Sequence, residues 1–305
     1  MPLSMKPPEP TPLRKPLDGF ASTVMLALCI CWGLQQVALK GAAPYMSPVL
    51  QVGLRSFFAA ILVAGVMLVR GESLSFRDGT FWPGLLAGFL FAGEFLLVSL
   101  GLNYTTAGHM AVFLYTAPVF TALGMHVWFW EERMKPRRWA GVGLAFAGIA
   151  LAFSGSFFAP GGKNRLLGDA LGILAGVFWA ATTISIRATR LADARPTRTL
   201  LYQLAVASLL LLPFAWWNGL LGAVKPSPVL WMCLVFQSVV VAFASFLTWF
   251  WLLRKYLASR LSSFSFLTPL FAVVFGILFL REPLDPRFAF GAIFVLAGVT
   301  IVNRK

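Results

Sequence analysis

The chain has 305 residues, of which 59% are hydrophobic and only 12% are charged. Soluble globular proteins average about 45–50% apolar and about 25% charged residues, so this composition excludes a soluble globule and indicates a polytopic membrane protein. The net charge of +14 would suggest a nucleic-acid partner in a soluble protein. Here the cations lie between apolar runs, as membrane topology requires, and we expect no nucleic-acid partner.

Residues 1–19 contain six prolines, which resist helix formation, so we expect a disordered cytoplasmic tail there. Runs of about 20 apolar residues then predict ten membrane-spanning helices. We place them near residues 20–39, 47–69, 80–102, 106–130, 137–155, 167–187, 197–217, 228–253, 258–280 and 287–303. The connecting loops are too short to form a soluble domain.

Basic residues favour one orientation of these ten helices. With the N-terminus in the cytoplasm, the inside segments hold 18 lysines and arginines and the outside loops hold 6, while Arg55 lies within a span. Cytoplasmic loops are enriched in such residues. We therefore expect a multi-pass protein of the bacterial inner membrane with both termini in the cytoplasm.

The second half of the chain repeats the first after about 150 residues. Matching pairs are Glu132 and Glu282, Pro136 and Pro286, Gly141 and Gly291, Gly148 and Gly298, Pro118 and Pro269, and Trp32 and Trp179. This divides the chain into a first repeat, 20–155, and a second, 156–305, each with five spans. Because five is odd, the two repeats must have opposite orientations, which is a frequent design of secondary transporters.

Several motifs carry a resemblance to a known family. They are PVFTAL at 118–123, the Glu-Glu-Arg turn at 131–133, YTTAGHMAVFLYTAPVF at 104–120 and REPLDPRFAFGAIFVLAGV at 281–299. These segments resemble the EamA module of the drug/metabolite transporter superfamily, and the chain looks most like the YddG-type exporters of aromatic and other neutral amino acids. The resemblance implies an all-α integral membrane protein, with ten helices around a central cavity. It places the fifth and tenth spans at the periphery and implies export of a small metabolite.

Glu94 is the one carboxylate that we place well inside a predicted span. A charge facing hydrocarbon would cost several kcal/mol, so Glu94 must be paired or functional. It could pair with Arg55 and hold two helices together, take up a proton that drives transport, or receive the amine of a substrate. A misplaced span boundary is the remaining alternative.

Other polar and aromatic side chains within the spans suit a site for a neutral amino acid, because amides and hydroxyls can bond both ends of a zwitterion. Interhelical packing would use the same groups. With Glu94, the candidates for substrate binding are Trp32, Gln35, Gln36, His109, Trp179, Thr183, Tyr202, Gln203, Gln237 and Ser263.

Prolines and small residues indicate how the helices bend and pack. Pro118 and Pro269 occupy equivalent positions in the two repeats and could be hinges or static kinks. Three pairs of small residues four positions apart predict close packing within the bundle, although a homodimer could also use them. These pairs are Gly84 with Gly88, Gly143 with Ala147, and Gly172 with Gly176.

No ATP-hydrolysing motif is present, so transport would have to be secondary or facilitated. The aspartates, among them Asp169, are scattered, each in a loop or at a helix end, and we expect no catalytic constellation, no metal site and no cofactor. We therefore predict a transporter that exports aromatic and other neutral amino acids by alternating access. The alternatives are a drug or nucleobase exporter, a membrane-embedded lipid-handling protein or enzyme, and a subunit that does not itself transport.

Overall fold

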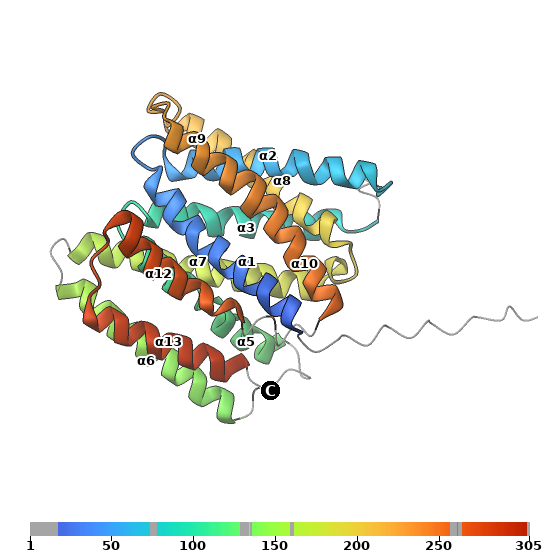
Figure 1. Ribbon diagram of the computed structural model, residues 1–305. Coiled ribbons are helices and arrows are strands. Elements are labelled where there is room, and N and C mark those ends of the chain that lie inside the picture. The colour runs from blue at the N-terminus through green and yellow to red at the C-terminus, as the bar shows by residue number, and fades with distance from the viewer. Residues whose placement is uncertain are drawn as a thin grey trace, which may run out of the picture.

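The computed structural model describes residues 18–73, 78–128, 134, 136–158, 162–256, 261 and 264–303, and the elements it assigns there are helices (Figure 1). The predicted tail at 1–17 and the candidate Ser263 lie outside the described residues. In chain order the helices are α1 (Gly19–Gly41), α2 (Pro48–Val69), α3 (Phe81–Gly101), α4 (Ala107–Leu114), α5 (Ala117–Trp128), α6 (Pro136–Phe158), α7 (Gly162–Ala188), η2 (Arg190–Ala192), α8 (Pro196–Trp217), α9 (Pro228–Val235), η3 (Phe236–Ser245), α10 (Phe246–Lys255), α12 (Leu267–Leu280) and α13 (Pro286–Asn303).

Within the described residues, seven segments are long and apolar enough to cross a membrane. They are α1, α2, α3, α4 with α5, α7, α8, and α9 through α10. Helices α12 and α13 are apolar but shorter. The prediction of a membrane protein with several spanning helices is thus confirmed, and the count of ten spans stays a prediction.

Local sequence signals explain where several helices begin. The Asp18 carboxylate accepts a hydrogen bond from the backbone nitrogen of Ala21, 2.7 Å away, and so caps α1. Ser47 and Ser227 cap α2 and α9, and each is followed by a proline at the first helical position. Proline fits there because that residue's N–H would have no partner inside the helix.

Two predicted spans are not continuous α-helices. The span predicted at 106–130 is present as a candidate span at Ala107–Trp128, but its helix breaks at Tyr115 and Thr116 into α4 and α5. Pro118 explains the break because it lacks an N–H and would clash with the carbonyl of the preceding turn. The predicted helix at 228–253 has a π-helical middle, η3, which joins α9 to α10. Such wide turns are rare and often occur at functional sites.

The largest buried apolar cluster joins α2, α3, α7 and α8, with Val63, Phe95, Ala175 and Leu204 among its members. Helices α6 and α13 lie side by side at one edge of the bundle, where the resemblance placed the fifth and tenth spans (Figure 1). We call the end where α1 finishes and α4 begins the Lys40 end, and the end where α1 begins the Asp18 end. Under the predicted topology the Lys40 end faces outward.

Candidate functional site

Two buried residues of opposite charge lie on neighbouring helices α2 and α3. Arg55 is 0% exposed and Glu94 is 5% exposed. The guanidinium carbon of Arg55 lies 4.2 Å from the centroid of the Phe95 ring, and its charge interacts with that of Glu94. None of the three guanidinium nitrogens has a hydrogen-bond partner among the described residues. Arg55 therefore interacts with Glu94 through charge, without a hydrogen bond among the described residues, and the pairing of the two side chains stays a prediction.

Buried glutamines connect α2 to the π-helical η3. Gln237 Nε2 donates to Gln51 Oε1 over 3.1 Å, and Gln51 Nε2 donates to the carbonyl of Met46 over 2.8 Å. Gln51 was not singled out from the sequence. Two of the predicted candidates, Gln36 and Gln237, each keep a buried amide oxygen that has no hydrogen-bond partner in the part of the chain that the structure describes. Such an oxygen can accept a hydrogen bond from an ammonium group.

Aromatic side chains of both halves of the chain are fixed within the bundle. Trp32 Nε1 donates to Ser245 Oγ of η3 over 2.9 Å, and its ring packs edge-on against Trp249. Trp179 packs edge-on against Tyr115, with 5.2 Å between the ring centroids. The two tryptophans at equivalent repeat positions thus both face other aromatic rings.

The remaining predicted candidates lie in different surroundings. Tyr202 packs against Gly84 of α3 and its hydroxyl lies 3.2 Å from Thr80 Oγ1, close to the Asp18 end. Thr183 is exposed and its hydroxyl donates to the carbonyl of Trp179 in its own helix. Gln35 and Gln203 are buried. Among the candidates, the structure thus joins Trp32 to η3 and Gln237 to Gln51, and it places Tyr202 in a separate cluster.

His109 belongs to a buried polar network at the Lys40 end, together with a carboxylate that the sequence analysis placed at a helix end. That placement of Asp169 is wrong because α7 begins at Gly162, so Asp169 lies two turns inside the helix and is 0% exposed. His109 Nδ1 lies 3.1 Å from both Asp169 oxygens, and Arg165 Nη2 lies 3.1 Å from His109 Nε2. Because a guanidinium can only donate, Nε2 accepts and the neutral ring donates from Nδ1 to Asp169. Thr105 Oγ1 donates to the same carboxylate.

The start of α4 is held by residues from distant parts of the chain. The Glu282 carboxylate accepts hydrogen bonds from the backbone nitrogens of Ala107 and Gly108, over 2.7 and 3.2 Å. Lys40 Nζ donates to the carbonyls of Leu102 and Thr105. These contacts join α1, the α3–α4 turn and the α12–α13 connection at the Lys40 end.

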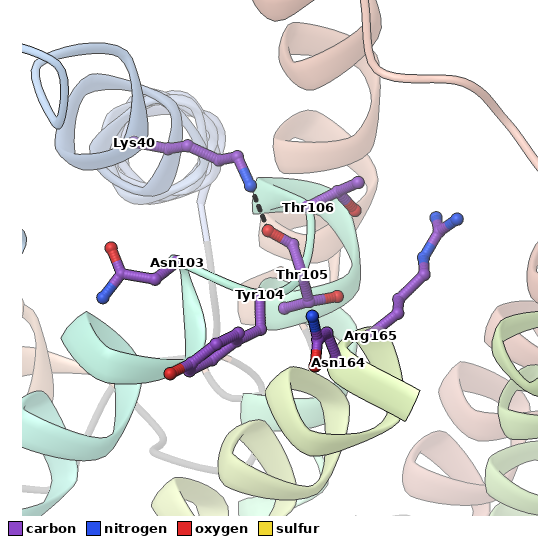
Figure 2. A pocket seen from close by; sticks show the side chains of 7 residues that line it. All are labelled: Lys40, Asn103, Tyr104, Thr105, Thr106, Asn164 and Arg165. Atoms are coloured by element: carbon purple, nitrogen blue, oxygen red, sulfur yellow. Dashed lines mark hydrogen bonds between the residues drawn. The ribbon is translucent and has the colours of Figure 1, made fainter. Parts of the chain in front are cut away.

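A pocket of about 360 Å³ opens beside these contacts (Figure 2). Its walls come from the end of α1, the α3–α4 turn and the start of α7. The side chains that line it are polar or cationic. It lies outside the set of substrate-binding candidates, since none of its lining residues was predicted from the sequence.

A model of the EamA-like transporter family matches residues 19–154 and 166–304. The chain is 30% identical over 298 residues to an uncharacterized transporter of Bacillus subtilis, YvbV, and the match covers 95% of this chain and 94% of that protein. It is 24% identical over 294 residues to a probable amino-acid metabolite efflux pump of Salmonella typhimurium, covering 93% and 94% of the two chains. One solved crystal structure shares the fold, with a TM-score of 0.63 at 19% identity, covering 93% of this chain and 97% of that one.

Proposed function

Since this chain belongs to the EamA-like transporter family, we propose that it exports aromatic and other neutral amino acids across the bacterial inner membrane. The proposed mechanism is secondary or facilitated alternating access, and the proposed subtype is that of the YddG-type exporters. A Salmonella typhimurium relative that is described as a probable amino-acid metabolite efflux pump supports this class of substrate.

One observation carries the proposal: the fully buried Arg55 guanidinium has no hydrogen-bond partner among the described residues and lies close to Glu94. A buried hydrogen-bond donor without a partner costs free energy, and a charged donor costs more than a neutral one. A substrate carboxylate would satisfy the guanidinium, and the substrate ammonium would bind Glu94. The zwitterion is neutral overall, so its binding adds no net charge to the membrane interior.

Contacts between equivalent residues of the two repeats support the proposed alternating access. Gly141 of α6 faces Gly298 of α13, and Gly148 faces Gly291. The sequence repeat pairs these glycines in the opposite sense, Gly141 with Gly291 and Gly148 with Gly298. A reciprocal exchange of this kind is what a two-fold relation between inverted repeats produces.

The test is efflux from proteoliposomes preloaded with twenty amino acids, with protein-free vesicles as the control. Neutral and aromatic amino acids should leave selectively. Absence of such efflux would refute the amino-acid assignment, and drugs and nucleobases would then be screened as alternative substrates.

Two variants test the roles of the buried charges. Arg55→Met should lower phenylalanine efflux about tenfold or more, since a hydrogen bond to a charged group is worth about 1.5–3 kcal/mol. Glu94→Gln should lower the efflux rate of phenylalanine, which carries an ammonium, more than that of 3-phenylpropionate, which lacks one. Gly143→Ala is the matched control, because a methyl group at Gly143 meets no atom within 4 Å. Equal slowing of both substrates by Glu94→Gln would contradict the assignment of the ammonium to Glu94.

A further inference from the structure

We propose that the pocket at the Lys40 end is a second, independent binding site, which takes the carboxylate of a small organic molecule from the aqueous side. The site is distinct from the buried Arg55 and Glu94. The proposal does not rest on amino-acid export, because the pocket is defined by its own charges and shape.

Two cations line the pocket from different helices. Lys40 comes from α1 and Arg165 from α7, and Figure 2 shows them on either side of the segment that carries Thr105 and Thr106. Asn103 and Asn164 add amide donors, and no carboxylate is among the lining residues. Cationic and amide N–H groups around one space are the chemistry that recognises a carboxylate.

The carboxylates nearest to this pocket are already engaged by other donors. Asp169 accepts from Thr105 Oγ1 and from His109 Nδ1. Glu282 accepts from two backbone nitrogens at the start of α4, although its charge also acts on Lys40. Neither carboxylate therefore occupies the pocket itself.

Both cations keep hydrogen-bond donors for a ligand. Lys40 Nζ has three N–H donors and gives two of them to backbone carbonyls. Arg165 has five, and Nη2, which binds His109, is the one guanidinium nitrogen with a hydrogen-bond partner among the described residues. A carboxylate bound in the pocket would gain charge-assisted hydrogen bonds from these cations.

The size of the pocket indicates a small ligand. A volume of about 360 Å³ falls at the lower end of the range of about 300–1,000 Å³ for small-molecule sites. Most of its lining side chains are polar, so the site should discriminate by charge more than by apolar shape.

The experiment is saturation-transfer NMR on the full-length protein in detergent, with N-acetylglycine as the probe. N-acetylglycinamide, which has nearly the same shape but no charge, is the matched control ligand. The carboxylate should bind and the amide should bind at least about tenfold more weakly. Equal binding of the two probes would overturn the proposal.

Variants place the bound probe within the protein. Lys40→Gln and Arg165→Gln should each raise the Kd of N-acetylglycine about tenfold, as the loss of a charged hydrogen bond predicts. Lys163→Gln, which changes an exposed lysine outside the pocket lining, should leave the Kd unchanged. If Arg55→Met abolishes binding while Lys40→Gln and Arg165→Gln do not, the probe occupies the buried site and the proposal fails.

Inorganic phosphate distinguishes a carboxylate site from a general anion or lipid-headgroup site. If phosphate binds ten times more tightly than N-acetylglycine, the carboxylate assignment is wrong. The experiment measures occupancy and not flux, so its failure leaves the export proposal intact, and a failure of export leaves the binding result intact.

Discussion

Gly148 and Gly291 face each other so closely that a methyl group on either would lie 2.7 Å from the carbonyl oxygen of the other. Both glycines sit where the backbones of α6 and α13 approach, and the close approach depends on the absent side chains. We predict that Gly148→Ala lowers stability by about 1–3 kcal/mol, because overpacking must push the helices apart. Thermal unfolding in detergent measures the effect as a lower midpoint.

The control is a glycine on the same helix that faces open space. A methyl group added at Gly143 meets no atom within 4 Å. Gly143→Ala should leave the midpoint unchanged or raise it, since alanine is favoured over glycine in a helix by about 0.5–1 kcal/mol. If Gly148→Ala and Gly143→Ala destabilise the protein equally, the contact between Gly148 and Gly291 does not control stability.

These glycines also show what the sequence could and could not predict. The spacing of four in Gly143 and Ala147 predicted close packing, yet the helix contact uses Gly141 and Gly148, seven residues apart. Seven residues make nearly two turns and so fall on one face, whereas Gly143 is about 200° away from Gly141. The other two small-residue pairs do pack inside the bundle, Gly84 and Gly88 against α8 and Gly172 and Gly176 against α4 and α5.

Helix positions were predictable where the sequence contains both an apolar run and a stop signal. Helix α2 was expected at 47–69 and runs from Pro48 to Val69, because Ser47 and Pro48 mark its start. Helix α7 was expected from 167 but begins at Gly162, since Lys163 and Arg165 extend the helix beyond its apolar part. That error placed Asp169 at a helix end and concealed its contact with His109.

The polar contacts themselves were not predictable, because they join residues far apart in the chain. Asp169 meets His109 across 60 residues, and Gln237 meets Gln51 across 186. No local pattern marks such partners without an alignment. The π-helical turn of η3 likewise has no residue-level signal in the sequence.

The glutamine pair leads to a second prediction. Gln51→Leu removes the acceptor of Gln237 Nε2 and leaves that donor buried and unpaired, which costs about 1–3 kcal/mol. Replacing both glutamines by leucine should recover part of that loss, because removing both partners of a buried hydrogen bond is far less costly. A double-mutant cycle of unfolding midpoints measures the energetic coupling of the two side chains. If the effects of the two single substitutions simply add, the side chains are not coupled.

Phe95 provides a third prediction, because its ring lies against the Arg55 guanidinium, which has no hydrogen bond to any described residue. Phe95→Leu should destabilise the protein by about 2 kcal/mol beyond the loss of ring volume, as desolvated cation–π contacts do. In an Arg55→Met background this extra cost should disappear. Phe91→Leu, on the same helix, estimates the cost of the lost ring alone. A cost of Phe95→Leu that is the same in both backgrounds would exclude the cation–π contact.

The fourth prediction concerns acid and the Asp18 end, where Asp78 ties the α2–α3 connection to α8. Thr80 Oγ1 donates to the Asp78 carboxylate over 2.5 Å, Thr80 N donates over 3.0 Å, and Arg198 forms an ion pair with it. These contacts, the Thr80 hydroxyl first among them, hold the pKa of Asp78 below its usual value. A depressed pKa in the folded state stabilises the protein above the unfolded pKa of about 3.9. This stabilisation is lost as the pH falls through the folded pKa.

Asp78→Asn therefore should lower the unfolding midpoint at pH 7 and have no effect once wild-type Asp78 is itself protonated. Because Asp78 is 44% exposed, solvent screens the ion pair, and the difference at pH 7 should stay below about 1 kcal/mol. Unfolding midpoints of both proteins between pH 7 and pH 3 measure this, and the two curves should converge as the pH falls below about 4. Asp193→Asn, which changes an exposed aspartate after η2, is the control and should follow the wild type throughout. Curves for Asp78→Asn and wild type that stay parallel to pH 3 would mean that protonation of Asp78 does not loosen this end of the bundle.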